Sequence, residues 1–313
     1  MHSGKQHSTE APFKKRRLYT GQERTERSRP TMRLLANNKM SGTRPTAVAG
    51  LFYPDDPGEL RRGVDGFLDH GFRGEDDPGV PPKAIVAPHA GYPYSGPIAG
   101  SAFASFQPLR GRIERIVVIG PSHHVPFEGL ALPTADAFDS PLGRVELDLE
   151  ACEQLLEHPE VHLDSRPHQR EHAIEVELPF LQQVLGPFRL VPLIVGQASP
   201  EVVADVLGDV WGDERTRIVV SSDLSHFLDD AAARRTDQET AAQVLELAHD
   251  LTPHQACGAR AWNGLNLLAQ RQALKARLLD LRNSGDTAGG RDRVVGYGAF
   301  SYDSALPKES EPA

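Results

Sequence analysis

The sequence predicts an α/β protein with a single domain, built around a largely parallel central sheet with helices on both faces. Two observations predict this class. Short aliphatic runs alternate along the chain with longer patterns of helical period, which is the order expected of strands joined by helices. The aliphatic runs are also apolar at nearly every position, as is typical of parallel strands that are covered on both faces.

The predicted strands are runs rich in β-branched and aliphatic residues, at positions 84–87, 115–119, 190–195, 217–221 and 294–300. The predicted helices lie between or beside them, at positions 57–68, 149–156, 172–184, 200–210, 236–247 and 258–270. A polar, glycine-rich segment at 284–293 is expected to be a loop, and the chain shows no internal repeat. The alternation of the two kinds of element is the reason to expect a largely parallel sheet.

The two ends of the chain lack the apolar periodicity of a folded domain. The first 39 residues carry ten basic and three acidic side chains, a net charge of +7, which leaves 24 basic and 40 acidic side chains, a net charge of −16, for the rest. We therefore expect a disordered basic tail over residues 1–43, a folded domain over 44–302 and a second disordered tail over 303–313. The acidic domain should repel nucleic acid, which leaves only the basic tail to attract it.

Composition also bounds the class of protein. No apolar run approaches the roughly 18 residues that a membrane-spanning helix requires, and no signal-peptide core follows Met1. The cysteines, Cys152 and Cys257, are too few for a disulfide framework and suit a reducing compartment. We therefore expect a cytoplasmic protein with no membrane partner. Since no methionine follows Met40, one hypothesis is that Met40 is the natural start and that residues 1–39 are an extension of the gene prediction.

Polar clusters follow three of the predicted strands, directly at the strand ends. His89 follows the first strand, His123 and His124 follow the second, and the strand at 217–221 runs into Asp223 and His226. In an open α/β sheet, ligands bind in the crevice outside the carboxyl ends of the strands, so these loops should meet in space. We therefore expect several imidazoles at one rim of the sheet.

A single histidine after a strand is usually a structural residue, but three such strand ends favour a metal site or a catalytic site. Adjacent residues on an extended segment point to opposite sides, so only one of His123 and His124 is expected to face a metal ion.

Two further segments carry candidate residues. His172 stands at the predicted start of a helix, about one turn from Glu175 and on the same face, where the pair forms either part of a site or only a solvated polar side. Cys257 precedes an apolar helix, whose N-terminus should lower the pKa of the thiol and favour the thiolate, although a small buried residue is the plainer alternative. Cys152 lies beside Glu150 and Glu153, where the carboxylates disfavour a thiolate, and we interpret it as structural.

These segments together resemble the Memo family, whose prokaryotic members are often called AmmeMemoRadiSam system protein B. The resemblance covers residues 44–302 and is carried by AVAGLFYP at 47–54, PHAGY at 88–92, GPSHH at 120–124, Glu171-His172, SSD at 221–223 with His226, and Cys257-Gly258. The fold of the family is similar to that of class III extradiol dioxygenases, which bind a non-haem iron through two histidines and a carboxylate.

The resemblance implies roles for individual residues. His89 and His123 correspond to the two histidine ligands, and Cys257 takes the place of the carboxylate. His226, with Asp223 near it, falls where those dioxygenases keep a general base, and His172 is the next candidate. The implied cofactor is one metal ion, Fe(II) first, with Cu or Zn as alternatives, because a thiolate is softer than a carboxylate. For the same reason catechol cleavage does not follow from the fold.

Three functions are compatible with these residues. The first is a metal-dependent, dioxygenase-like oxidoreductase that acts on an unknown small molecule. The second is a non-catalytic module that binds a peptide or protein in the same cleft, lined by Tyr92, Tyr94 and His226, since animal relatives are described as adaptors in cell signalling. The third is a metal-dependent hydrolase in which His226 acts as the base. The prokaryotic family name also implies a radical SAM protein and an AMMECR-type protein as partners.

Overall fold

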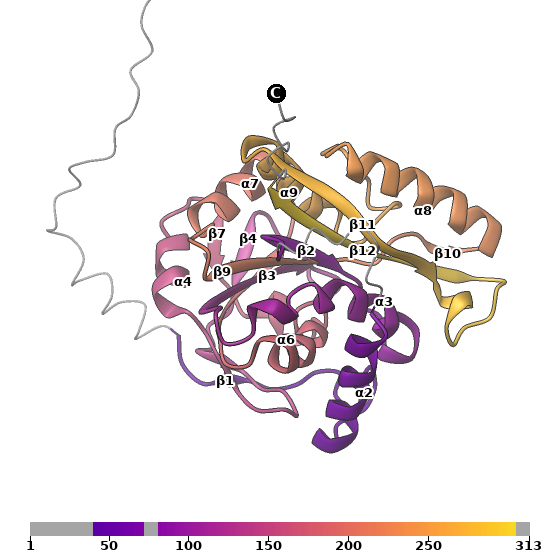
Figure 1. The fold of residues 1–313 in the computed structure, drawn as a ribbon. Helices are drawn as coiled ribbons and strands as arrows, with labels where there is room; N and C mark the ends of the chain where they lie inside the picture. Colours follow the sequence, from indigo (N-terminus) through magenta and orange to yellow (C-terminus); the bar gives the residue numbers. More distant parts are fainter. Residues whose placement is uncertain (1–39, 72–80, 305–313) are drawn as a thin grey trace, which may run out of the picture.

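Four parallel strands form the centre of the sheet in the computed structural model, which describes residues 40–71 and 81–304 (Figure 1). In their order across the sheet they are β2 (Ala84–Ala87), β9 (Thr216–Ser221), β3 (Arg115–Pro121) and β8 (Arg189–Val195). Almost every residue of these strands is buried, as expected for strands covered on both faces. The predicted α/β class is confirmed.

Antiparallel pairs flank this parallel centre on both sides. Beyond β2 lies β12 (Val294–Ser304), which also pairs with β11 (Leu274–Asn283) and β10 (His226–Leu228). Beyond β8 lies β4 (Leu130–Leu132), which is followed by β7 (Val161–Leu163) in parallel. A separate small sheet is formed by β1 (Thr43–Arg44), β5 (Ala137–Phe138) and β6 (Val145–Glu146).

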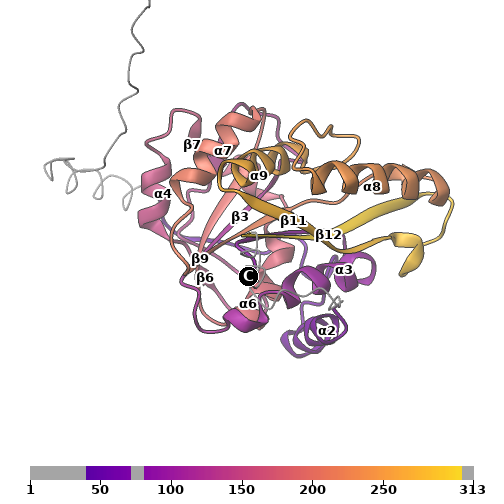
Figure 2. The same ribbon diagram turned by 45° about the horizontal axis from the view of Figure 1, so that its top comes forward.

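Helices cover both faces of the large sheet, as Figure 2 shows. One face is covered by α2 (Pro57–Asp69), α3 (Tyr92–Ala104) and α6 (Leu178–Leu185). The other face is covered by α7 (Pro200–Asp209), α8 (Asp230–Leu245) and α9 (Ala259–Arg271), with α4 (Leu149–Leu155) against α7. Shorter helical turns are α5 (Arg166–Gln169), η1 (Gln107–Leu109), η2 (Glu175–Glu177) and η3 (Ser284–Asp286). Among the described residues, no helix combines the length and the apolar character needed to span a membrane.

Most helix starts follow from local signals in the sequence. Side chains of Asp56, Asp148, Ser199 and Asp229 accept hydrogen bonds from backbone N–H groups in the first turns of α2, α4, α7 and α8. These caps satisfy donors that the helix itself leaves unpaired. They explain why the predicted starts at residues 57, 149 and 200 agree with the structure. The cap of α8, Asp229, was not recognised, and this helix begins six residues before its predicted start.

The five predicted strands are all present, but two long elements were missed. α3 carries Pro93 and Pro97 and several glycines, a composition that argues against a helix in isolation. It forms because its small residues allow close packing on α2, where Gly96 and Gly100 contact Phe67. β11 was missed because charged residues interrupt its apolar pattern.

The described part of the chain begins at Met40, which is 3% exposed, and continues through β12 to Ser304. Most of the two predicted tails, residues 1–39 and 305–313, lies outside the described residues.

We expect Gly100→Ala to lower the melting temperature, because a methyl group at this position would overlap the backbone oxygen of Phe67. Overpacking of this kind costs about 1–3 kcal/mol. The matched control is Gly63→Ala, also inside a helix, where the methyl group meets nothing within 4 Å and should slightly stabilise the protein. Equal melting temperatures for the two variants in thermal unfolding would show that α2 and α3 do not pack this closely.

Candidate metal centre

The histidines predicted at strand ends do meet in space. The strands β2, β9 and β3 are parallel and adjacent, so the segments that follow them leave the sheet at the same edge. His89 follows β2, and His123 follows β3. Together with His172 they form a group whose ligand atoms all lie within 4.8 Å of one another. The strand ends and the loops that follow them therefore bring together side chains from three distant parts of the chain.

The ring orientations decide which imidazoles can share an ion. The ring of His89 is nearly perpendicular to that of His123, at 83° and 5.2 Å between centroids, and to that of His172, at 89° and 5.3 Å. The rings of His123 and His172 are stacked, at 13° and 4.7 Å. A nitrogen lone pair lies in the plane of its ring, so two stacked rings cannot aim at one ion without rotating. His89 can therefore share an ion with one of the two stacked rings as they stand.

Hydrogen bonds fix His89 from two sides. Its backbone N–H donates to Asp223 Oδ1 at 2.8 Å, and its Nδ1 lies 2.7 Å from Ser221 Oγ. Burial, with a smaller contribution from the positive charge of His123, lowers the pKa of His89 to about 3. The ring is therefore neutral, as a metal ligand must be. With Nδ1 engaged by Ser221, Nε2 is the nitrogen that faces Cys257 Sγ, at 3.2 Å.

A buried glutamate stands behind this contact. Ser221 Oγ lies 2.8 Å from Glu177 Oε1 and 2.6 Å from the carbonyl oxygen of Ala173. Burial raises the pKa of Glu177 well above its usual value, which favours the neutral carboxyl. A hydroxyl has one proton and cannot donate to both oxygens, and a protonated Glu177 resolves this by donating to Ser221. Ser221 can then accept the Nδ1–H of His89, which leaves the lone pair of Nε2 open.

His123 is held by a second glutamate, Glu171. Its backbone N–H donates to Glu171 Oε2 at 2.7 Å, and its Nδ1 lies 2.8 Å from Oε1. Burial alone would raise the pKa of Glu171, but the hydrogen bonds and charge of His123 hold it at about 2. In turn, burial lowers the pKa of His123, but the hydrogen bond and charge of Glu171 outweigh it, so the net shift is upward. A carboxylate behind an imidazole is the arrangement that orients many metal-bound histidines.

His172 does not open a helix, so that prediction was wrong. It lies in a loop ahead of η2, and the α-helix itself starts only at Leu178. The expected partner Glu175 points elsewhere. It is buried, forms an ion pair with Arg44 and accepts the hydroxyl of Tyr53 at 2.7 Å. The ring of His172 instead stacks on His123, and burial lowers its pKa to about 3.

Cys257 lies one residue before Gly258, the N-cap of α9. Its Sγ accepts the backbone N–H of Asp223 at 3.3 Å. Burial raises the pKa of the thiol above its ordinary value, and the charge of Asp223 adds to this. The N-terminus of α9 does lower this pKa, through the backbone N–H of Gly258, but burial outweighs it, so the expected thiolate is not favoured. A cation beside the sulfur reverses the balance, because metal binding displaces the thiol proton.

Asp223 and His226 lie beside the group without belonging to it. Asp223 is buried and holds the backbone of His89, so it supports the end of β2. Burial raises its pKa, and a positive charge on His226 opposes this. His226 is half-buried at the start of β10, where it pairs with Val295 of β12. The structure thus places both predicted residues at the rim, with Asp223 bonded to His89.

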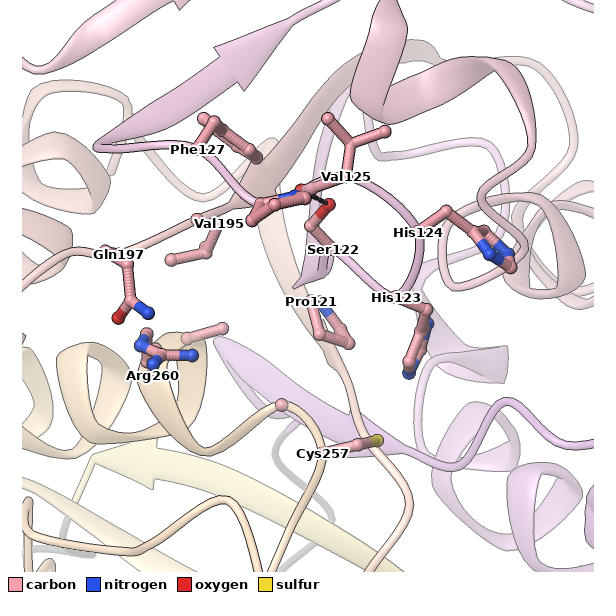
Figure 3. A pocket seen from close by; sticks show the side chains of 14 residues that line it. Pro121, Ser122, His123, His124, Val125, Phe127, Val195, Gln197, Cys257 and Arg260 are labelled. Carbon is pink, nitrogen blue, oxygen red and sulfur yellow. Dashed lines mark hydrogen bonds between the residues drawn. The ribbon is translucent and has the colours of Figure 1, made fainter.

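A cavity of about 270 Å³ opens beside this group (Figure 3). His123 and Cys257 line it on one side, and Arg260 and Gln197 lie on the other. His124 also lines the cavity, but of this pair only His123 belongs to the three-histidine group. His226, which was also expected to line the cleft, does not line this cavity, and neither do Tyr92 and Tyr94.

For the two tyrosines the reason lies in α3, the helix missed from the sequence. Tyr92 is its first residue and is buried, with its hydroxyl donating to the carbonyl oxygen of Val176 at 2.7 Å, and Tyr94 lies on its exposed side. Sequence reasoning also missed the roles of Ser221, Glu177, Arg260 and Gln197, since each depends on a long-range contact. Glu171 was quoted only as part of a motif, although its position next to His172 placed it near the site.

Comparison with known proteins identifies the family of this chain. A family model described as Memo-like protein matches residues 44–301. The chain belongs to the Memo family. Relatives include proteins named "MEMO1 family protein" from Aquifex aeolicus, 35% identical over 81% of this chain and 97% of the relative, and from Desulfurococcus amylolyticus, 31% identical over 83% and 98%. A third, from Nitrosopumilus maritimus, is 29% identical over 83% and 99%. The predicted resemblance is confirmed over nearly the whole described chain.

We expect Glu171→Gln to weaken metal binding about 10- to 100-fold, the usual cost of losing a carboxylate behind a metal-bound imidazole. The amide also removes the negative charge that raises the pKa of His123, so this pKa should fall in the metal-free protein. Competition with a chelator measures the first effect, and NMR titration of the histidines measures the second. Glu239→Gln, an exposed change on α8, is the control of equal charge. Unchanged affinity would mean that Glu171 supports only the loop.

Proposed function

We propose that this Memo-family protein is a metal-dependent oxidoreductase that acts on a small molecule, with His89, His123 and Cys257 as ligands of one ion. The observation that carries the proposal is the convergence of the His89 and His123 ligand atoms beside Cys257 on the wall of an open cavity. An ion held there would face the cavity, and three protein ligands leave positions open for a substrate.

The chemistry of these side chains fits a metal. His89 is neutral, and its Nδ1 is engaged by Ser221. His123 has a carboxylate behind its Nδ1, which leaves Nε2 for an ion. Cys257 supplies a sulfur that becomes anionic when a cation displaces its proton. These two imidazoles and one thiolate accept Fe(II), Cu or Zn, and Fe(II) is the choice that the family resemblance favours.

The stacking of His172 on His123 supports Cys257 as the third ligand. If His89 and His123 share the ion, His172 lies parallel to His123 and would have to rotate to join them. Cys257 needs no such change, since its sulfur already lies 3.2 Å from His89 Nε2. The three-histidine group is itself a candidate ligand set, and the contact of Cys257 with His89 is the reason to propose the cysteine as the third ligand in place of His172.

The protein's own residues would divide the remaining work. Bound Fe(II) would supply redox chemistry and open coordination positions for substrate or oxygen. The cavity wall places a small molecule against His123 and Cys257. For a proton acceptor we propose His226, since the pKa of His172 is held at about 3 and such a ring is a weak base near neutral pH. We also propose a radical SAM protein and an AMMECR-type protein as partners, because the family resemblance implies them. We propose a cytoplasmic location, because the free cysteines suit a reducing compartment.

We expect His89→Ala, His123→Ala and Cys257→Ala each to lose the metal, and His172→Ala to keep it. The three residues supply all protein ligands in this proposal, whereas His172 supplies none. Elemental analysis after anaerobic loading with Fe(II) gives the metal content per chain. Loss of the ion in His172→Ala together with its retention in Cys257→Ala would replace the proposed set with three histidines. Tight zinc in the native protein, without redox activity, would favour a hydrolase at the same site.

We expect His226→Ala to retain the metal and to lose turnover by a factor of about 10² to 10⁴, the usual cost of removing a general base. Oxygen consumption by the iron-loaded protein, with small phenols and carboxylates as trial substrates, measures the rate. The companion variant His162→Ala removes an exposed imidazole on β7, outside the cavity, and should leave the rate unchanged. Full activity in His226→Ala with the metal in place would assign the base elsewhere, and loss of the metal would make His226 a ligand.

A further inference from the structure

We propose that the cavity beside the metal centre binds a small monocarboxylate with an apolar body, and that Arg260 is the residue that selects it. This inference rests on the proposed function, because it names the substrate class of the same site. It concerns the wall of the cavity that faces the predicted ligands.

Arg260 reaches the cavity because of where α9 begins. Cys257 precedes the helix, and Arg260 is its second residue, so the metal centre and the arginine share one cavity. Figure 3 shows the guanidinium beside the amide of Gln197, across the cavity from His123. A molecule between them would contact the arginine at one end and the metal centre at the other.

The charge of Arg260 has no partner within the described chain. It is the one partly buried arginine of residues 40–71 and 81–304 with no hydrogen bond, ion pair or ring contact. The other arginines without such a partner are exposed, and they are Arg61, Arg62, Arg112, Arg170 and Arg235. Partial burial weakens the hydration of a cation, so an unpaired guanidinium in a cavity favours an anionic ligand.

The surroundings define the anion further. No carboxylate lines the cavity, and the two acids beside the metal centre are already engaged, Glu171 by His123 and Asp223 by the backbone of His89. A guanidinium binds a carboxylate through two parallel hydrogen bonds, and Gln197 offers an amide beside it. One cation balances one negative charge, whereas a phosphate dianion would leave excess charge in a domain of net charge −16 outside its first 39 residues.

Two further polar residues, Ser122 and His124, line the cavity, the rest of the wall is apolar, and the space is small. The apolar lining consists of Val125, Pro126, Phe127, Val195 and Ala261. The volume of about 270 Å³ lies below the roughly 300–1,000 Å³ of sites for drug-sized ligands. The ligand is therefore a small molecule with one carboxylate and an apolar body, such as an aromatic or short aliphatic acid.

Benzoate and its neutral analogue benzamide test this directly. Calorimetry on the full chain, with and without metal, should show that benzoate binds more tightly than benzamide to the wild type. Arg260→Met keeps the length of the side chain and removes the charge, and it should weaken benzoate binding about tenfold or more, the expected loss of a charge-assisted pair. Arg260→Lys should restore part of the affinity. Arg235→Met, an exposed change on α8, alters the net charge equally and should have no effect.

Equal benzoate binding to wild type and Arg260→Met would overturn the inference, as would no preference for benzoate over benzamide or no benzoate binding at millimolar concentration. Tighter binding of phenyl phosphate than of benzoate would overturn the assignment to carboxylates. The metal content of the same variants shows whether a negative result concerns the carboxylate site or the proposed metal centre. If Arg260-dependent benzoate binding persists while the ligand variants keep their metal, only the proposed metal centre fails. If Arg260→Met keeps its metal and its affinity for benzoate, only this inference fails.

Discussion

The parallel pairing of β2, β9 and β3 is the constraint on which the rest of the structure depends. Parallel strands end at the same edge, and here each ends in a polar segment that can contact the other two. Ser221, the last residue of β9, bonds to the ring of His89 after β2, and Asp223 bonds to the backbone of the same histidine. A shift of register by one residue would move these contacts to the opposite face. The sheet therefore sets the geometry of the site before any ligand binds.

One short segment supplies most of the electrostatic support, and its three glutamates behave differently. Glu171 is ionised because backbone and imidazole donors surround it. Glu175 is paired with Arg44 and ties the N-terminal segment to the domain. Glu177 is neutral, since it is buried with a hydroxyl as its one bonded partner among the described residues. Glu171 thus orients the imidazole of His123, and Glu175 holds the N-terminal segment. Glu177 acts through Ser221 on the tautomer of His89.

The sheet and the histidines at its strand ends could be predicted from the sequence, because both depend on residues that are neighbours along the chain. The apolar runs at β2 and β9 could be read directly, and the rule for strand ends placed His89 and His123 together. What failed depended on tertiary packing. The Glu171–Glu177 segment was predicted as a helix since its period fits one, but burial of Glu175 against Arg44 and the late helix start at Leu178 prevail. The pKa of Cys257 was misjudged because helix position is visible in sequence and burial is not.

The site is organised without help from a metal. Small zinc domains gain much of their folding energy from the ion, because their ligands are otherwise free. Here the ligands belong to a sheet whose strands are buried on both faces, and hydrogen bonds to Ser221, Glu171 and Asp223 hold them. In the metal-free state His89 is neutral and Cys257 keeps its proton, so burial leaves no uncompensated charge at these two ligands. A metal bound here would displace the thiol proton of Cys257, and hydrogen bonds to Ser221 and Glu171 would already orient the two imidazoles.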